Sequence, residues 1–485
     1  MPDGAVTAGS YRGYQTVGLL LGPALFVALS ASPVPAGLSP AGWSTAAVAV
    51  WMAAWWATEA VPLAATALLP LVLLPVLGIA DARAAAAPYA DPLIYLFLGG
   101  FVIAAAVQRW SLHRRIALHI VILVGSRPRS LVAGVMLATA VLSMWISNTA
   151  TAMMMLPIAA SLVAVASGED DAGAVVGSNF ATAMMLGVAY AASIGGLATL
   201  IGSPPNALAA GFLAQGFGVT VGFAGWMAVG VPVAVAMLPL AWLVLTRVAF
   251  PFADTAPQGG RDALAGMLRA MGPVSVPEKR VAAVFAAVAV CWILRPFLDD
   301  LLGRGLVTDT GLAIAGAVAL FAIPADWRRR EFLMDWPSAK RLPWEILVLF
   351  GGGLSLARAI ETSGLAGWLG GGLDLLAIAP PVVLLVGVTL LVILLTELTS
   401  NTATTAALLP VVAAFADGTG LSATVVAMAV ALAASSAYML PVATPPNAIV
   451  FGSGYITLPQ MLRAGLLLNL AGVAVITAVL SIAAT

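Results

Sequence analysis

Charged residues are scarce in this sequence. Only 9% of its 485 residues are Asp, Glu, Lys or Arg, whereas a soluble domain carries roughly 25%. The formal net charge is zero, so the composition gives no reason to expect a nucleic-acid partner. Cysteine is nearly absent as well. Cys291 stands alone, which excludes an intramolecular disulfide framework and a metal cluster held only by cysteines.

Hydrophobic residues dominate instead. They make up 61% of the chain, and the mean hydropathy is +1.04. This length and composition predict an all-α polytopic membrane protein with about 11 transmembrane helices. The first 16 residues are polar and lack the basic segment and small-residue cleavage site of a signal peptide, so we expect no cleaved leader. The lipid bilayer of the inner (plasma) membrane is the expected environment.

One polar pentapeptide occurs twice inside long apolar runs. Ser-Asn-Thr-Ala-Thr spans 147–151 within the run 131–167, and it returns at 400–404 within the run 381–416. Unpaired hydroxyl and amide groups cost several kcal/mol each in hydrocarbon, so packing is a poor reason for keeping them twice. We predict that each run is a re-entrant hairpin with the pentapeptide at its tip.

Two further apolar runs are interrupted by Pro-Pro-Asn. Residues 204–206 divide the run 174–211, and residues 445–447 divide the run 421–455. Proline lacks an N–H, and the nearby Gly195 and Gly196 tolerate unusual dihedral angles, so we predict two broken helices. A helix broken at this depth exposes backbone N–H groups from one half and carbonyl groups from the other.

The motifs recur in the same order, which predicts an internal repeat. We divide the chain into an N-terminal segment with the first span (1–41), a first repeat (42–250), a cytoplasmic linker (251–280) and a second repeat (281–485). With five elements per half after the first span, the repeats have opposite topology. Inverted repeats with two hairpins and two broken helices are typical of secondary transporters.

Basic residues set the expected orientation. If Arg12 is cytoplasmic, the basic clusters within 109–129, 247–280 and 326–341 share that side, and the connection 361–380, which has no Lys or Arg, is external. The N-terminus is then cytoplasmic and the C-terminus external.

The hairpin tips combine groups suited to an anion with groups suited to a cation. An Asn side chain offers N–H to an anion and oxygen to a cation, and a hydroxyl does either. No Lys, Arg or His lies in either pentapeptide or either Pro-Pro-Asn segment. A dianionic substrate there needs bound cations, which favours Na⁺ coupling over an exchanger with fixed positive charge. Glu397 lies beside the second pentapeptide, where both a structural role and attraction of Na⁺ are open.

The sequences around the tips resemble a known transporter family. Residues 145–151 and 396–402 look like the paired Ser-Asn-Thr motifs of the divalent anion/sodium symporter family, and residues 441–448 are similar to its signature near the second broken helix. The resemblance covers the chain from Thr58 to Gly452. It implies a homodimeric elevator transporter, with a scaffold and a transport domain, for dicarboxylates such as succinate, malate or fumarate.

The resemblance also implies the ligands of two Na⁺ sites and a substrate site. One Na⁺ site would use Ser143, Ser147, Asn148 and the carbonyl of Gly196. The other would use Thr396, Thr399, Ser400, Asn401 and the carbonyl of Ala443. The substrate would meet residues of both tips and both breaks, namely Asn148, Thr149, Ser400, Asn401, Thr402, Ser203, Thr444 and Pro445.

Other functions are left open by the residues. A Na⁺-independent dicarboxylate exchanger and a sulfate or tricarboxylate symporter belong to the same class, since hydroxyls that meet one dianion also meet another. An intramembrane hydrolase would need a Ser–His pair, paired aspartates or a metal site inside the membrane. The two histidines, His113 and His119, lie in a basic interfacial stretch, so we do not expect an enzyme.

Overall fold

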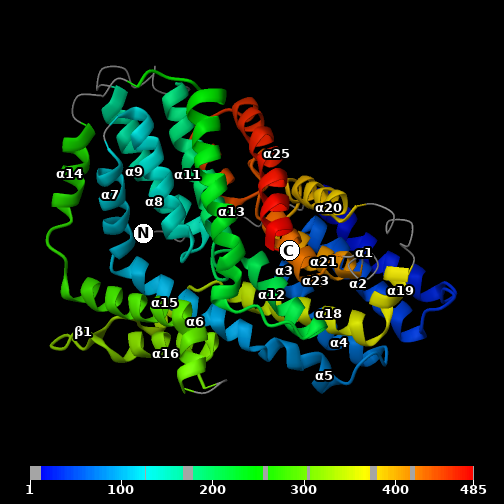
Figure 1. Ribbon diagram of the computed structural model, residues 1–485. Helices are drawn as coiled ribbons and strands as arrows, with labels where there is room; N and C mark the ends of the chain where they lie inside the picture. Colours follow the sequence, from blue (N-terminus) through cyan, green and yellow to red (C-terminus); the bar gives the residue numbers. More distant parts are fainter. Residues whose placement is uncertain are drawn as a thin grey trace.

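The computed structural model describes residues 13–125, 127–167, 178–254, 260–302, 306–371, 380–414 and 421–483. Regular structure in these ranges is almost entirely helical, and a two-stranded β-hairpin is the exception. Figure 1 shows that segments far apart in the sequence lie side by side. The last helix, α25 (Leu458–Ala483), runs next to α13 (Phe223–Leu243) from the middle of the chain.

Up to residue 254 the elements are α1 (Gly13–Ala31), α2 (Pro40–Thr58), α3 (Leu63–Thr66), α4 (Leu69–Val76), α5 (Ala82–Ala86), the 3₁₀ helix η1 (Ala87–Ala90), α6 (Pro92–Arg109), α7 (Leu112–Val124), α8 (Pro128–Ser143), α9 (Asn148–Ser167), α11 (Asn179–Leu197), α12 (Pro204–Phe217), α13 and the π-helical η2 (Val244–Ala249).

After residue 260 they are α14 (Gly260–Ala270), α15 (Val276–Leu302), α16 (Asp309–Ala322), β1 (Pro324–Asp326), β2 (Glu331–Phe332), α17 (Trp336–Ala339), α18 (Trp344–Thr362), α19 (Leu365–Gly371), α20 (Pro381–Thr396), α21 (Asn401–Ala414), α23 (Ala423–Ala434), α24 (Pro445–Gly452) and α25.

Both pentapeptides lie where two helices are joined by a short turn. Helices α8 and α9 flank residues 144–147, and α20 and α21 flank residues 397–400. Pro128 and Pro381 are the first residues of α8 and α20, where the missing N–H removes no helical hydrogen bond. Asn148 and Asn401 are the first residues of α9 and α21, so each stands at a helix N-terminus with free backbone N–H groups.

Both Pro-Pro-Asn motifs begin a new helix after an irregular segment. Residues 198–203 separate α11 from α12, and residues 435–444 separate α23 from α24. Ser178 and Ser422 cap the starts of α11 and α23 by accepting from the backbone N–H groups of Ala181 and Val425. In both halves, the helix before the break therefore begins after a capping serine, and the helix after the break begins with Pro-Pro-Asn.

The two halves interlock through glycines. A Cβ on Gly99 of α6 would lie 2.6 Å from the backbone of Ala313 in α16, and a Cβ on Gly352 of α18 would overlap the backbone of Ala67 at the end of α3. Each half thus packs a glycine-bearing helix directly on an element of the other half. One hydrophobic core contains residues of both 42–250 and 281–485, so these two segments, which we predicted to be repeats, are not separate globular units.

The segment 251–280, expected to be a linker, contains α14 and the beginning of α15. Helix α14 packs against α7 and α9 and buries Leu264. Next to it, Arg115 of α7 forms a buried ion pair with Glu278 of α15, with 2.9 Å between Nε and Oε1, and donates to the Gly272 carbonyl. The connection between the halves is therefore attached to the first half rather than free of it.

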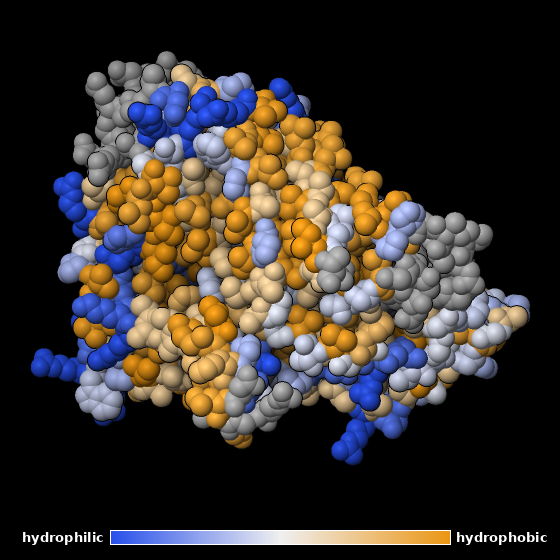
Figure 2. Space-filling view, in the orientation of Figure 1, coloured by the Kyte–Doolittle hydropathy of each residue, from blue (hydrophilic) through white to orange (hydrophobic). Residues whose placement is uncertain are grey.

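Five helices among the described residues are long and apolar enough to cross a membrane: Ala82–Arg109, Asn179–Leu197, Phe223–Ala249, Val276–Asp299 and Leu458–Ala483. Seven shorter apolar helices accompany them, including α8, α9 and α20. Figure 2 shows a mostly hydrophobic surface over α13 and α25, interrupted by a few more polar residues. Val235, Leu240 and Leu470 of these helices are exposed. A hydrophobic surface of this kind suits contact with lipid. The total of about 11 spans and the inverted order stay predictions.

Candidate functional site

Asn148 is the centre of the first tip. The Ser143 hydroxyl oxygen lies 2.6 Å from its Oδ1 and 2.7 Å from the carbonyl oxygen of Ala192 in α11. The same corner of the Asn148 amide lies 3.0 Å from the Ala192 oxygen and 3.3 Å from the Gly202 oxygen in the break. One hydroxyl and two backbone carbonyls therefore surround a single amide atom.

The Asn148 amide can satisfy these neighbours in two ways. With its nitrogen turned toward them, it donates to the two carbonyls and pairs with the Ser143 hydroxyl. With its oxygen turned toward them, the amide oxygen, the Ser143 hydroxyl oxygen and the two carbonyl oxygens lie close together. Such a group of four oxygens would need a cation between them. The amide has nearly the same shape in both orientations, and the orientation that donates to the two carbonyls satisfies all of these neighbours with protein atoms alone.

The second tip repeats the first. The Thr396 hydroxyl oxygen lies 2.8 Å from Asn401 Oδ1 and 2.9 Å from the carbonyl oxygen of Ala434 in α23. Thr396 stands at the end of α20 as Ser143 stands at the end of α8. Ser143 and Thr396 share only the hydroxyl, so the hydroxyl is the group that both tips keep.

Glycines allow α11 to approach the first tip. A Cβ on Gly196 would overlap the Asn148 amide, and a Cβ on Gly195 would overlap the Ala140 backbone. A larger residue would push α11 off the hairpin. The structure thus places the Gly196 backbone next to the Asn148 amide, and the role of its carbonyl as a Na⁺ ligand stays a prediction.

The asparagines of Pro-Pro-Asn hold the breaks in shape. The Nδ2 of Asn206 donates to the carbonyls of Gly196 and Thr199 at 2.9 and 2.8 Å, and the Nδ2 of Asn447 donates to Ala437 and Leu440 at 3.3 and 3.0 Å. One amide therefore serves two carbonyls near the end of a helix, and those of Thr199 and Leu440 also accept from the backbone N–H groups of Gly202 and Ala443. The Oδ1 of each asparagine is buried, and none of the residues that the structure describes donates to it, so each break also presents a neutral oxygen acceptor.

Glu397 is bound into the second break. Its carboxylate accepts from the backbone N–H groups of Tyr438, Met439 and Leu440 at 2.8 to 2.9 Å and from Asn469 Nδ2 at 2.7 Å. It is 4% exposed. All four partners are donors, and none of the described Lys or Arg side chains pairs with it. The contacts support the structural role, in which Glu397 fixes the irregular backbone after α23.

The two halves meet between the breaks. The hydroxyls of Ser203 and Ser435 lie 2.9 Å apart, and the rings of Tyr190 and Tyr438 meet edge to face at 5.3 Å. Helix α24 packs on α9, and α12 packs on α21, so each broken helix rests on the hairpin of the other half. The two tips and two breaks thus belong to one packed block.

Three of the predicted substrate ligands have free hydroxyl groups. The side chains of Thr149, Ser400 and Thr402 are half-buried and form no hydrogen bond with protein atoms in the described part of the chain. Pro445 is exposed as the first residue of α24, whereas Thr444 is buried and accepts from the Asn447 N–H at 3.2 Å. Ser203 is buried against Ser435.

The other predicted Na⁺ ligands have local partners. Ser147 Oγ accepts from the Ala150 N–H at 3.4 Å, and the Thr399 hydroxyl meets the Thr404 hydroxyl at 2.6 Å and the Leu395 carbonyl at 2.9 Å. Ala443 is buried just before α24. Its counterpart in the first half, counted from Pro-Pro-Asn, is Gly202 rather than Gly196.

Sequence reasoning missed the carbonyls of Ala192, Ala434 and Gly202. The Ala-Ala-Ser triplets at 191–193 and 433–435 carried a signal, because the repeat placed them at matching positions in both halves. Every residue type has a backbone carbonyl, so the residue type does not show which carbonyl takes part in a site. The repetition of Ala-Ala-Ser was the signal in the sequence.

The family follows from comparison with known proteins. A model of the "sodium:sulfate symporter transmembrane region" matches residues 14–483. The chain belongs to this family of transporters. The sodium-dependent dicarboxylate transporter SdcS of Staphylococcus saprophyticus is 41% identical over 476 residues, covering 97% of this chain and 91% of the relative. SdcS of Staphylococcus aureus is 41% identical over 460 residues, with coverages of 94% and 88%. The resemblance seen in the sequence is confirmed, and the protein is a transporter rather than an enzyme.

Solved transporter structures share the fold. The YdaH transporter of Alcanivorax borkumensis aligns with a TM-score of 0.55 at 15% identity, covering 97% of this chain and 96% of YdaH. MtrF of Neisseria gonorrhoeae aligns with a TM-score of 0.60 at 11% identity, covering 97% and 95%. At this identity the likeness concerns the fold alone.

Proposed function

We propose that this transporter couples Na⁺ entry to import of a C4-dicarboxylate such as succinate, malate or fumarate. The observation that carries the proposal is the doubled set of hydroxyl, amide and carbonyl groups, Ser143–Asn148–Ala192 in one half and Thr396–Asn401–Ala434 in the other. Hydroxyl, amide and carbonyl oxygens at broken helices are the ligands that Na⁺ takes in transporters. The relatives named sodium-dependent dicarboxylate transporters support the same cargo.

Each tip supplies one Na⁺ site in this proposal. The first uses Ser143, Ser147, Asn148 and the Gly196 carbonyl, and the second uses Thr396, Thr399, Ser400, Asn401 and the Ala443 carbonyl. The carbonyls of Ala192 and Ala434 lie close enough to join them. The buried Oδ1 atoms of Asn206 and Asn447 fit the same chemistry, because they are oxygens that the protein leaves without a donor.

The substrate carboxylates bind at the free hydroxyls of Thr149, Ser400 and Thr402 and at the N-terminal N–H groups of α9 and α21. Since no cationic side chain lies in either tip, two Na⁺ ions offset the dianion. Opposite charges a few Å apart at low dielectric attract by several kcal/mol. Substrate affinity should therefore depend on Na⁺.

An elevator motion fits the packing between the halves. Rocking one half against the other would separate α24 from α9 and α12 from α21. Moving both tips and both breaks as one block keeps the two Na⁺ sites and the substrate site together. A homodimer with a cytoplasmic N-terminus and an external C-terminus completes the proposal.

Uptake and binding by the purified protein test this function. Labelled succinate should enter proteoliposomes only with an inward Na⁺ gradient, and calorimetry should show succinate affinity rising with Na⁺. By reciprocal linkage, succinate must raise Na⁺ affinity by the same factor. Succinate affinity that stays flat from zero to saturating Na⁺ would contradict the coupling and favour an exchanger. Sulfate or citrate competing as well as succinate would contradict the substrate class.

The orientation has its own test. A cysteine at Ser338, introduced after Cys291→Ser, should react with an impermeant maleimide only in inside-out vesicles. Labelling from outside intact cells would reverse the assignment.

A further inference from the structure

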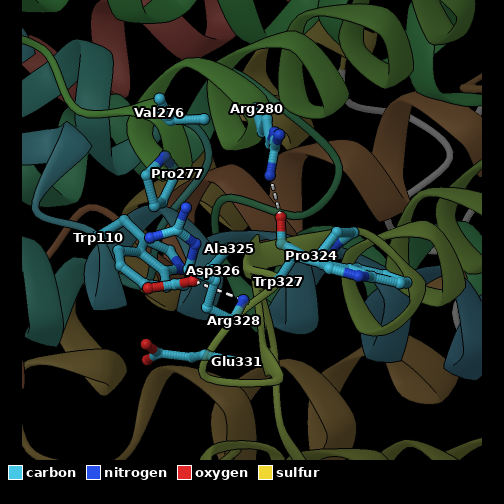
Figure 3. Close-up of a pocket in the computed structure, with 10 residues that line it drawn as sticks. All are labelled: Trp110, Val276, Pro277, Arg280, Pro324, Ala325, Asp326, Trp327, Arg328 and Glu331. Carbon is cyan, nitrogen blue, oxygen red and sulfur yellow. Dashed lines mark hydrogen bonds between the residues drawn. The ribbon is translucent and has the colours of Figure 1, made fainter.

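A cavity of about 720 Å³ lies away from the hairpin tips, where the start of α15 meets the β1–β2 hairpin. Figure 3 shows its lining, which combines two indoles, two guanidinium groups and two carboxylates. These side chains are Trp110, Trp327, Arg280, Arg328, Asp326 and Glu331. The transport site uses none of them.

The mouth of this cavity lies at the expected boundary between lipid and water. The apolar stretch of α15 is only 22% buried, and Val290 and Ile293 are about half exposed, at 51% and 49%, so this helix presents an apolar face to its surroundings. Near the start of that helix, in the β1–β2 hairpin, Trp327 is 76% exposed and is followed by three exposed arginines, 328–330. Tryptophan beside a basic cluster marks the head-group level of a membrane.

Both signs of charge have unused hydrogen-bonding capacity in the cavity. The Arg280 guanidinium donates through one nitrogen to the Pro324 carbonyl, and the Arg328 side chain has no ion pair or hydrogen bond among the described residues. Glu331 binds Arg109 through Oε1 at 3.2 Å, which leaves its other oxygen free. Asp326 Oδ1 accepts from the Arg328 N–H at 2.8 Å, while Oδ2 has only a 3.7 Å contact with Arg329.

We propose that this cavity binds the head group of phosphatidylethanolamine. The guanidinium groups of Arg280 and Arg328 take the phosphate, which they match as charge-assisted donors. The primary ammonium donates to Asp326 and Glu331 beside the indole of Trp110. The acyl chains follow the exposed apolar face of α15. Phosphatidylglycerol offers the same phosphate but no ammonium group for the two carboxylates, and a choline head group has no N–H to donate. The proposal is independent of which ion or substrate is transported.

Lipid binding by the full-length protein tests it. Purified, delipidated protein is titrated with phosphatidylethanolamine, phosphatidylcholine and phosphatidylglycerol that carry the same acyl chains, and bound lipid is counted by native mass spectrometry. Phosphatidylethanolamine should bind about tenfold more tightly than the other two, as expected for one extra charge-assisted contact. Equal affinity for the three lipids, or preference for phosphatidylglycerol, would overturn the proposal. So would equally tight binding of soluble phosphoethanolamine, which would make the ligand a free metabolite.

Matched charge variants locate the site. Arg328→Gln removes a cavity guanidinium and should weaken phosphatidylethanolamine binding about tenfold. Arg330→Gln removes the same charge from the same hairpin outside the cavity and should leave binding unchanged. An equal loss of phosphatidylethanolamine binding in both variants would show that binding depends on the overall surface charge rather than on this cavity, and it would overturn the assignment. Arg280→Gln repeats the test from α15, so a folding defect in one variant does not decide the outcome.

Discussion

The two hairpin tips have the same polar skeleton and different apolar surroundings. In the first tip, Trp145 stacks on Phe223 and Trp292, with ring centroids 5.8 and 6.5 Å away, and meets Phe285 edge-on at 5.1 Å. The matching residue of the second tip is Leu398, which is 74% exposed. The polar contacts are thus repeated, while the first tip rests on an aromatic wall formed by residues of α13 and α15 and the second tip does not.

One residue, Asp309, holds the aromatic wall in place through both its carboxylate and its backbone carbonyl. Asp309 accepts from the Phe223 N–H at 2.8 Å and from Arg295 at 3.1 Å, and its carbonyl accepts from the Trp292 indole at 2.9 Å. The first tip therefore touches a cluster that a residue of α16 fixes. If the tip moves as an elevator requires, Trp145 has to leave this cluster.

The turns that follow α8 and α20 also differ in charge. The second has Glu397, which binds three backbone N–H groups of its break, and the first has Met144, whose carbonyl accepts from the Thr199 hydroxyl. The Thr199 hydroxyl in the first half and the Glu397 carboxylate in the second half each connect the tip to the break by hydrogen bonds. The difference teaches that the two tips share their polar side chains but not the contacts that hold each tip against its break.

The largest effect should come from Glu397→Gln. Glutamine keeps one acceptor oxygen and turns an NH₂ group toward at least one of the donors, so a buried N–H loses its partner. We expect the free energy of unfolding to fall by about 3 kcal/mol, seen as a lower thermal midpoint in detergent. Glu361→Gln makes the same change on an exposed side chain and should stay within about 0.5 kcal/mol. An unchanged midpoint in Glu397→Gln would show that its contacts are not structural.

Trp145→Ala and Leu398→Ala compare the surroundings of the tips directly. Removing the stacked indole should cost about 2–3 kcal/mol, because its contacts with the aromatic wall are lost. Removing the exposed leucine should cost no more than about 0.5 kcal/mol. Thermal midpoints of the two proteins, purified side by side, provide the measurement. Equal destabilisation would mean that the aromatic wall does not support the first tip.

Asn206→Ala and Asn447→Ala should behave alike, since each asparagine bridges two carbonyls in the same way. We expect a loss of about 2 kcal/mol in each. Sodium titration of thermal stability adds a second readout. If the buried Oδ1 atoms also ligate Na⁺, both variants should need a higher Na⁺ concentration for half of the maximal stabilisation. A loss at only one break would contradict the equivalence of the two.

Much of this architecture could be predicted from the sequence, because apolar runs and repeated polar motifs report directly on helices, hairpins and breaks. Ser143 contacts Asn148 and Thr396 contacts Asn401, while their role as Na⁺ ligands stays a prediction. The role of Asn206 as a bridge between carbonyls could not be predicted, since its partners are backbone atoms. The helix in 260–270 was missed because its composition resembles a loop with basic residues, and it is its packing on α7 that places it in the fold.

The smallest and sharpest comparison concerns two threonines at matching positions. Thr404 pairs its hydroxyl with Thr399 at 2.6 Å, but the first half has Ile146 in place of Thr399, and the Thr151 hydroxyl is buried without a partner. Valine has nearly the same shape as threonine. Thr404→Val should therefore cost about 1 kcal/mol by breaking a hydrogen bond, whereas Thr151→Val removes an unsatisfied group and should be neutral or stabilise by up to about 1 kcal/mol. Opposite signs in the thermal midpoints measured without Na⁺ would support this assignment. If Thr151→Val instead destabilises the protein, its hydroxyl has a partner that the protein alone does not supply, and repeating the measurement with Na⁺ would show whether that partner is the ion.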